Sequence, residues 1–350
     1  MSDWRERLDP LQCDLLNGYR RGVPIAPRPY ARMADDLDVS VAAVRAAIAD
    51  LREQGLIRRI GPAIATRHVG ASTLAALAVP DRAVDSVGRQ VATRAAVTHA
   101  YRRDHRYSLW LVLTARDRAR IDTALDTIAA RTGFEPLDLP AENVYAHDLA
   151  FPVCDRDPLA ATRETPPPRP DRPIDPAERH LLAALQDGLP IAPAPYDRVA
   201  TDLGCDRSDV IDRLRTLHDG GFVRRVGLVV SHRATGYDAT AMVVWAVPRD
   251  DLDRAGRATA RTRGVTKAYA RPARPERDWS YRLFTMVHAR TPEARDRAID
   301  RLADSIGHPH ERLATISKYG QSGARIDSVR PDENSDEAAA SLIGRDGCGE

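Results

Sequence analysis

The sequence is poor in cysteine, the residue that forms the disulfides of small secreted proteins and binds structural metal ions. Its four cysteines, Cys13, Cys154, Cys205 and Cys348, are scattered and include no C-x-x-C pair. Disulfide scaffolds and cysteine-based zinc modules are therefore disfavoured. The chain begins M-S-D-W-R-E-R with no apolar segment behind it, and no stretch approaches the roughly 18 apolar residues of a membrane span. We expect a reduced, cytoplasmic protein with no membrane partner.

The sequence also has few lysines and a small net charge. Lys267 and Lys318 are the only lysines among 52 basic residues, and 50 acidic residues reduce the formal net charge to +2. So small a charge provides no general positive field for nucleic acid or for an anionic membrane. Any anion site must be local, and arginine, which supplies nearly all the basic residues, is suited to bidentate contacts with carboxylates.

The clearest internal feature is a repeat. G-V-P-I-A-P-R-P-Y at 22–30 returns as G-L-P-I-A-P-A-P-Y at 188–196, with seven of nine positions identical. V-T-H-A-Y-R-R at 97–103 returns as V-T-K-A-Y-A-R at 265–271. A period of this length is too long for a solenoid, so the sequence predicts two copies of a domain-sized unit.

Each copy has the pattern of two successive domains. Amphipathic helices over 28–38 and 41–54, with Ser40 as the N-cap of the second, precede a β-branched run broken at Gly61-Pro62, which is typical of a winged helix-turn-helix. The order that follows is β-α-β-β-α-β, with strands at 73–79, 97–103, 107–115 and near 143–148 and helices at 81–94 and 117–132. In the second copy we expect strands near 239–247, 265–271 and 280–289 and helices near 249–263 and 292–306.

The predicted fold class is α+β, a tandem duplication in which each copy is a winged helix-turn-helix followed by a ferredoxin-like domain, as in the Lrp/AsnC regulators. A stretch with seven prolines in 22 residues separates the copies and predicts an extended linker. The expected boundaries are winged helix 1–64, ferredoxin-like domain 65–154, linker 155–176, winged helix 177–230, ferredoxin-like domain 231–330 and a disordered tail 331–350.

The predicted recognition helices argue against DNA binding. Helix 41–54 carries two arginines against two acidic residues, and 208–219 carries two against three. Attraction to phosphates dominates non-specific affinity for DNA, so neutral or acidic recognition helices disfavour a DNA-binding regulator. The arginine pairs 58/59 and 224/225 in the wings are the evidence on the other side.

Polar residues cluster on two repeated strands. The two-residue period of a strand places His99, Tyr101 and Arg103 on one face, with His105 at the following hairpin. The second copy offers Lys267, Tyr269 and Arg271 on the matching face. Taken one at a time, such residues are usually solvated or structural. Their clustering, which the isolated His147, His308 and His310 lack, favours a site for an anionic, preferably polycarboxylate, ligand.

Two segments then carry a family resemblance. Y-R-R-D-H-R-Y-S-L-W at 101–110 and R-P-A-R-P-E-R-D-W-S-Y-R-L-F-T-M-V-H at 271–288 resemble the paired signatures of the sirohaem decarboxylases. The resemblance implies removal of carbon dioxide from the acetates on rings C and D of sirohaem, in haem d1 synthesis or the alternative haem pathway, with no cofactor beyond the iron carried by the substrate. Ser108 and Arg282 replace the family's Asn, Ser280 replaces Pro, and Lys267 replaces a second-module His.

The resemblance also implies roles for individual residues. We expect His105 to donate a proton or to act as an axial ligand to the substrate iron, with Tyr101 and Arg103 beside it as catalytic residues. The expected substrate-binding residues are Arg58, Arg59, His99, Tyr107, Trp110, Tyr269, Arg271, Arg274, Trp279, Tyr281 and His288.

Two other functions stay open from the sequence. One is a regulator that senses haem or another tetrapyrrole and binds DNA, and the other is a binding module that leaves its ligand unchanged. The expected partners are sirohaem and its decarboxylated products. We also expect the two copies to pair within the chain, and leave open whether the chain pairs further as a homodimer.

Overall fold

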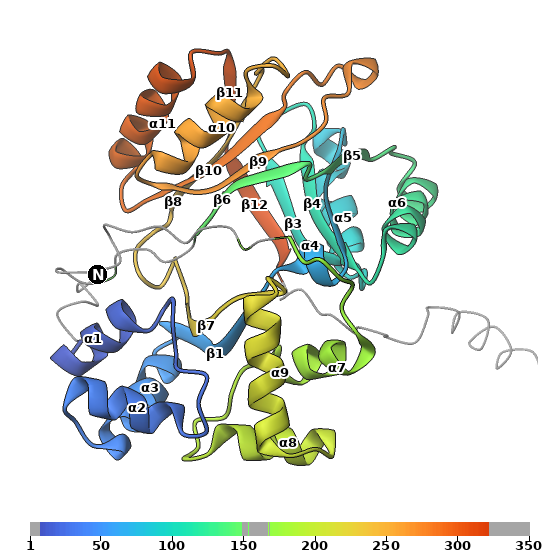
Figure 1. Cartoon of the computed structure of the whole chain (residues 1–350). Helices are drawn as coiled ribbons and strands as arrows, with labels where there is room; N and C mark the ends of the chain where they lie inside the picture. The colour runs from blue at the N-terminus through green and yellow to red at the C-terminus, as the bar shows by residue number, and fades with distance from the viewer. Residues whose placement is uncertain (1–7, 149–152, 154–166, 168, 322–350) are drawn as a thin grey trace, which may run out of the picture.

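A computed structural model describes residues 8–148, 153, 167 and 169–321 of the chain. The helical domains of both copies lie in the lower half of Figure 1 and two five-stranded sheets lie above them. No helix in these ranges is long and apolar enough to cross a membrane. The tail 331–350 and most of the linker 155–176 fall outside the described residues, so their expected character stays a prediction.

The helical domains confirm the predicted helix-turn-helix pairs and add a helix before each. The Ser40 hydroxyl accepts a hydrogen bond from the Ala43 amide at 3.1 Å, as expected of an N-cap. The additional helices, α1 and α7, each begin with an aspartate capping box. The elements are α1 (Pro10–Gly18), α2 (Pro29–Leu37), α3 (Val41–Glu53) and β1 (Ile57–Ile64), and in the second copy α7 (Pro176–Leu185), α8 (Pro195–Leu203), α9 (Arg207–Asp219) and β7 (Val223–Val230).

The wings differ from the expected small, interrupted wing of each copy. Strand β1 runs unbroken through Gly61-Pro62 and pairs antiparallel with β7 of the other copy. A two-stranded sheet consists only of edge strands, and an edge strand tolerates a proline because its missing N–H can face away from the partner. The two helical domains also share one apolar core. The two helical domains are therefore one structural unit rather than two independent domains.

The repeated P-I-A-P segments reinforce this joint. The Arg215 guanidinium on α9 donates to the Ile25 carbonyl of the first copy at 2.8 Å. In the reverse direction Arg45 on α3 donates to the Ile191 carbonyl at 3.2 Å, and the Tyr30 hydroxyl donates to the Pro190 carbonyl at 3.0 Å. One arginine of each candidate recognition helix thus donates a hydrogen bond to the other copy.

Above the wings, each copy contributes a ferredoxin-like β-α-β-β-α-β unit, as predicted. The first comprises β2 (Ala71–Leu77), α5 (Asp81–Ala92), β3 (Val97–Arg103), β4 (Leu109–Ala115), α6 (Arg118–Thr132) and β5 (Leu137–Pro140), preceded by the short α4 (Thr66–Val69). The second comprises β8 (Ala239–Trp245), α10 (Leu252–Arg261), β9 (Val265–Ala270), the 3-10 turn η3 (Pro275–Arg277), β10 (Leu283–Ala289), α11 (Pro292–Ile306) and β11 (His310–Leu313).

The strand expected near 143–148 forms, but not in its own sheet. Strand β6 (Asn143–His147) pairs with β9 of the second copy, and β12 (Thr315–Gln321) pairs with β3 of the first copy. The sheet orders are therefore β12-β3-β4-β2-β5 and β11-β8-β10-β9-β6. The last strand of the first ferredoxin-like unit is β5, which the sequence analysis missed because only four residues form it. Each sheet is completed by a strand of the other copy.

Two tyrosines fix the exchanged strands by matching contacts. The Tyr319 hydroxyl on β12 donates to Asp85 of α5, and the Tyr145 hydroxyl on β6 donates to Asp253 of α10 at 2.6 Å. Each ring packs on a helix glycine, so a Cβ placed at Gly88 or at Gly256 would lie 2.3 Å from the ring. These glycines are needed for the close approach of a ring.

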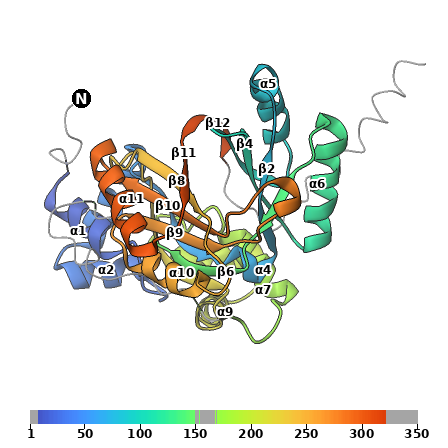
Figure 2. The same ribbon diagram turned by 90° about the horizontal axis from the view of Figure 1, so that it is seen from above.

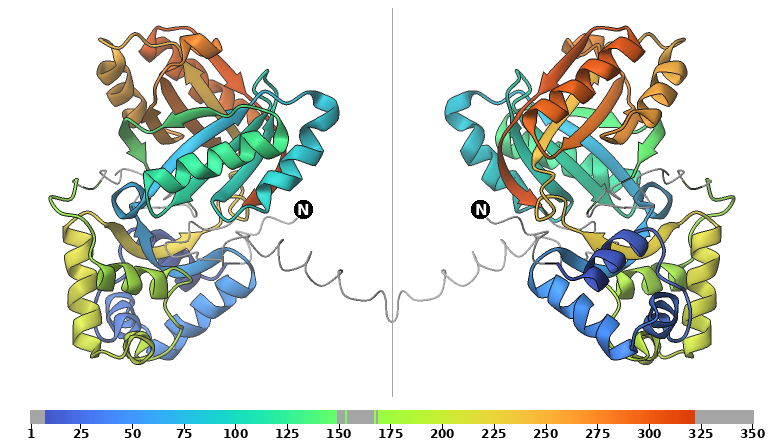
Figure 3. Two further views of the ribbon diagram at one scale, coloured as in Figure 1. Left: turned by 90° about the vertical axis from the view of Figure 1, so that its right-hand side faces the viewer. Right: turned by 90° about the vertical axis from the view of Figure 1, so that its left-hand side faces the viewer.

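The helices cover the outer faces of the sheets. In the view from above, α5 and α6 lie on one side and α10 and α11 on the other, with the strands between them (Figure 2). The side views of Figure 3 show the sheets standing on the joined helical domains. The inner faces meet through an apolar cluster that includes Trp110, Trp279 and Phe284. Strand residues that point away from the helices therefore face the ferredoxin-like unit of the other copy. Each such unit is called a module below.

We predict that Gly88→Ala destabilises the chain by about 1–3 kcal/mol, because the added methyl group overpacks against the Tyr319 ring. The measurement is the free energy of unfolding in denaturant. The matched control is Gly18→Ala, where a Cβ meets nothing within 4 Å. Equal stability of Gly88→Ala and the wild type would contradict the close packing of β12 on α5.

Candidate active site

The predicted polar faces of β3 and β9 turn toward each other's module. Ala100 on β3 packs into the core under α5 and α6, and Ala268 on β9 packs into the core under α10 and α11. Because side chains alternate along a strand, the neighbouring polar residues point to the inner side. These are His99, Tyr101 and Arg103 on β3 and Lys267, Tyr269 and Arg271 on β9.

Arg103 and Arg271 occupy equivalent places and hold equivalent contacts. The Arg103 guanidinium lies 5.6 Å from the Tyr101 ring centroid and donates to the Leu313 carbonyl and the Thr315 hydroxyl, both at 3.0 Å. The Arg271 guanidinium lies 5.1 Å from the Tyr269 ring centroid and donates to the Leu139 carbonyl. Each arginine thus bonds to the segment that leads into the exchanged strand.

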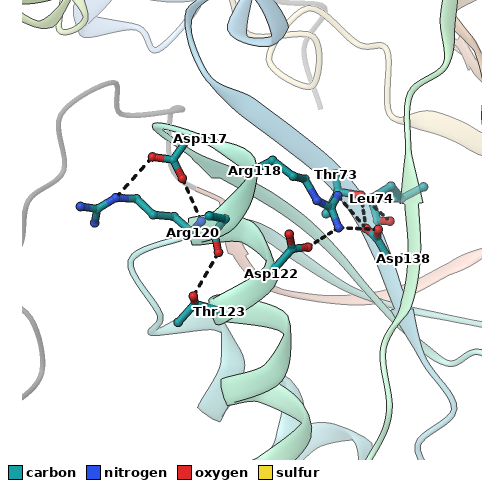
Figure 4. A network of polar contacts seen from close by, with 9 residues as sticks. Thr73, Leu74, Asp117, Arg118, Arg120, Asp122, Thr123 and Asp138 are labelled. Atoms are coloured by element: carbon teal, nitrogen blue, oxygen red, sulfur yellow. Dashed lines mark hydrogen bonds and ion pairs between the residues drawn. The ribbon is translucent and has the colours of Figure 1, made fainter.

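A polar network holds β5 in place for Arg271 (Figure 4). Arg118 at the start of α6 donates to Asp138 of β5 at 2.7 Å, and the Thr73 hydroxyl of β2 donates to the same carboxylate at 2.6 Å. Asp138 precedes Leu139, whose carbonyl accepts from Arg271. The contacts of Asp138 with Arg118 and Thr73 therefore help to hold in place the Leu139 carbonyl that accepts from Arg271.

Arginines from the helical domains join both sets. Burial lowers the pKa of His99 and raises that of Tyr101 in the first module, and the positive charge of Arg58 on β1 adds to the first shift and opposes the second. In the second module burial lowers the pKa of Lys267 and raises that of Tyr269, and Arg224 on β7, the counterpart of Arg58 in the repeat, adds to the first shift and opposes the second. The wings thus face the candidate site. A further matched pair, Arg67 and Arg233, acts on Tyr269 and Tyr101 respectively.

Positive charge dominates the electrostatics of this group. Burial lowers the pKa of His99 to about 3, and Lys267, Lys318 and Arg58 push it in the same direction. Burial and two arginines lower the pKa of Lys267 to about 8. His288, whose Nδ1 lies 2.9 Å from the Thr266 hydroxyl, has a pKa lowered to about 3 by burial, His232 and Lys267. His99 and Lys267 belong to different modules, so the two sets form one cationic group across the chain's internal pseudo-symmetry.

Arg103 is a buried cation with no carboxylate partner among the described residues. Its side chain is only 6% exposed, its Nε makes no hydrogen bond, and within the described residues it forms no ion pair with a carboxylate. Burial lowers its pKa to about 10. Leaving a buried cation without a counter-charge is costly. The arrangement suits an anion that arrives with the ligand.

His105 lies apart from this group, at the β3–β4 hairpin. Its Nδ1 accepts from the Tyr107 amide at 2.8 Å, and its Nε2 is 3.5 Å from Glu311. Its ring lies edge-on to Trp279 with centroids 5.7 Å apart. Trp279 also meets Tyr107, Trp110 and Tyr281, and these aromatic residues form the joint between the two hairpins. They lie within the apolar cluster that adjoins Arg271 through Phe284.

Two predicted arginines also lie elsewhere. Arg59 donates to the Pro62 carbonyl at 3.1 Å beside Gly188, within the joined helical domains. Arg274 forms an isolated bridge with Trp279 in the second hairpin. The structure therefore brings together Arg58, His99, Tyr101, Arg103, Tyr269, Arg271 and His288, and it places His105, Arg59, Tyr107, Trp110, Arg274, Trp279 and Tyr281 outside that group.

Several members of the group were not predicted as site residues. They are His147, Arg67, Arg224, His232, Arg233 and Lys318. Arg67 and Arg233 are separated by the same 166 residues as the repeated G-x-P-I-A-P-x-P-Y segments, which is a signal that could have found them. His147 and Lys318 reach the site only through strand exchange. Among the described residues, no group of three or more His, Cys, Asp or Glu side chains is arranged to hold a metal ion.

Comparison with known proteins places the chain among related sequences. A family model for the "Siroheme decarboxylase NirDL-like HTH domain" matches residues 12–58 and 178–224, and one for the "AsnC-like ligand binding domain" matches 69–145 and 234–319. The "Siroheme decarboxylase NirDL subunit" of Paracoccus pantotrophus is 38% identical over 331 residues, covering 92% of this chain and 99% of that protein. The chain belongs to the sirohaem decarboxylase family.

Other relatives of the sirohaem decarboxylase family correspond to one copy. The "Siroheme decarboxylase NirD subunit" of Pseudomonas aeruginosa is 47% identical over 146 residues, covering 42% of this chain and 97% of that protein. A crystal structure of "the siroheme decarboxylase NirDL" superposes with a TM-score of 0.73 at 21% identity, covering 95% of this chain and 99% of that one. A second, described as a complex with an "iron-uroporphyrin III analogue", gives a TM-score of 0.68 at 21% identity, with 95% and 97% covered. These likenesses confirm the predicted fold.

The histidines predict how stability depends on pH. The pKa of His99 and of His288 is about 3 in the folded chain, whereas in the unfolded chain it is near 6.5. As pH falls below about 6.5 the unfolded chain therefore takes up protons first, and the ligand-free protein loses stability down to about pH 3. Denaturant unfolding at pH 7 and pH 5 measures this loss, which should be smaller in His99→Gln. An equal loss in that variant would contradict the burial of His99.

Proposed function

We propose that the protein is a sirohaem decarboxylase that removes carbon dioxide from the acetates on rings C and D of sirohaem, giving 12,18-didecarboxysirohaem for haem d1 synthesis. The observation that carries this proposal is the buried cationic group shared by the two modules, with Arg103 and Arg271 at its ends. Sirohaem carries several acetates and propionates, so it can supply the missing negative charge. Membership of the sirohaem decarboxylase family supports the same substrate, and we propose that the iron enters with it.

The geometry suits the chemical demands of the reaction. Loss of carbon dioxide leaves an electron pair on the methylene carbon, which the attached pyrrole can delocalise until a proton arrives. The arginines would orient the carboxylates that do not react, and burial would exclude water from the one that does. In the first module Tyr101 and Arg103 lie in the group. His105 stays our candidate for proton donor, through the Nε2–H, because Nδ1 already accepts from the Tyr107 amide. As an iron ligand through Nε2 it would have to give up that hydrogen or exchange its tautomer.

The test of function is anaerobic incubation of the purified chain with iron sirohaem, followed by mass analysis of the extracted tetrapyrrole. We expect the stepwise loss of two carbon dioxides. An unchanged mass with a shifted Soret band would instead indicate a tetrapyrrole sensor, whose DNA affinity would fall steeply with salt. In the same assay His105→Ala should stop decarboxylation or alter the iron spectrum, whereas wild-type turnover and spectrum would limit His105 to its hairpin contacts.

A binding measurement tests the buried charge separately. Arg103→Met should weaken sirohaem binding by about 2 kcal/mol, roughly thirtyfold, because a charge-assisted hydrogen bond to a carboxylate is lost. The control is Arg106→Met, an exposed arginine three residues away that pairs with Asp278. Soret titration gives both affinities. Equal affinities for the two variants would exclude Arg103 as a carboxylate ligand.

A further inference from the structure

One histidine that the sequence left unassigned lies in direct contact with the second module's tyrosine. His147 is the last residue of the exchanged strand β6, and its Nδ1 lies 2.8 Å from the Tyr269 hydroxyl. The two rings are edge-to-face, with centroids 6.0 Å apart. The strand register places His147 opposite Lys267, and the Arg224 guanidinium donates to the His147 carbonyl at 3.0 Å. A first-copy strand therefore delivers an imidazole to the second-copy site.

The surroundings of this pair are positively charged. The charged groups that act on His147 are Arg224, Lys267, Arg225 and Arg67, and together with burial they hold its pKa well below 6.5. The imidazole is therefore neutral. Burial raises the pKa of the Tyr269 hydroxyl, and the Arg271 guanidinium over its ring, together with Arg224 and Arg67, offsets part of that rise. A phenol placed among cations can lose a proton to a substrate and keep its negative charge stabilised.

We propose that Tyr269 is the proton donor of the second module and that His147 is its positioning residue. This inference rests on the proposed decarboxylation. In the tautomer with hydrogen on Nδ1, His147 donates to the Tyr269 oxygen and leaves the hydroxyl proton free to point toward the substrate. The same hydrogen bond then stabilises the phenolate oxygen after transfer.

The step balances without a further reactant except water. The bond between the acetate methylene and its carboxylate breaks, carbon dioxide leaves, and both bonding electrons stay on the methylene and the pyrrole. The Tyr269 O–H bond then breaks and its proton forms a C–H bond, which converts the methylene into a methyl group. The tyrosinate finally takes a proton from water, which leaves hydroxide and so releases the negative charge of the lost carboxylate to solvent.

The first module lacks this pair. Tyr101 is the counterpart of Tyr269, and its ring lies beside that of His99 on the same strand, with centroids 6.0 Å apart. Within the described residues the Tyr101 hydroxyl makes no hydrogen bond to a histidine. The two modules are therefore chemically different, and removing the Tyr269 hydroxyl should affect one decarboxylation more than the other.

The test compares Tyr269→Phe, His147→Leu and His147→Asn in an anaerobic time course with iron sirohaem. Mass analysis resolves the first and second losses of carbon dioxide, and Soret titration gives the affinity for sirohaem. We expect Tyr269→Phe to slow one of the two losses at least a hundredfold, in the range of general acid catalysis, so that a monodecarboxylated product accumulates. The affinity should stay within about threefold of wild type, since the phenyl ring and the arginines are retained.

The histidine variants separate positioning from packing. His147→Leu should slow the same loss at least tenfold, whereas His147→Asn, whose amide N–H can occupy the place of Nδ1, should retain most of the rate. His218→Leu, at an exposed position on α9, is the control and should match wild type. Wild-type rates for Tyr269→Phe, or equal impairment by Asn and Leu, would overturn this inference alone. A wild-type chain that releases no carbon dioxide would overturn the proposed function and the inference with it.

Discussion

The buried positive charge of Arg103, which meets no carboxylate partner within the described residues, is the constraint on which this structure depends. The guanidinium groups of Arg103 and Arg271 each lie over a tyrosine ring, and burial, Arg224 and Arg271 lower the pKa of Lys267. Burying these cations reduces the stability of the ligand-free chain. Such an arrangement is useful if a polyanion supplies the missing charge, because the cost of burial then becomes part of the discrimination for that ligand.

The exchange of strands β6 and β12 explains how two copies build one such group. Each exchanged strand adds polar residues to the other copy's sheet, and the Tyr145 and Tyr319 contacts hold it against a helix of that copy. The paired wings place Arg58 and Arg224 at the same inner faces. A single copy has neither the completed sheet nor the opposing set of cations.

Much of the fold could be predicted from the sequence, because the repeat and the hydrophobic periods are local signals. The inward face of β3 follows from the two-residue period of a strand, and so does the meeting of His99, Tyr101 and Arg103. Strand exchange has no local signal, since a strand has the same pattern whichever sheet it joins. His147 was for that reason left as an isolated histidine. The role of His105 stays a prediction, and its hairpin contacts with Glu311 and Trp279 could not be read from its place in the motif.

The central claim is that the ligand's carboxylates neutralise the buried cations. Calorimetric titration near pH 6.5, in buffers of different ionisation enthalpy, tests it most directly with iron tetrapyrroles that carry progressively fewer carboxylates. We predict that affinity falls with each carboxylate removed, and that binding of the richest ligand takes up protons because the lowered pKa values of His99, His232 and His288 rise. Affinity independent of carboxylate number, with no proton uptake, would contradict it.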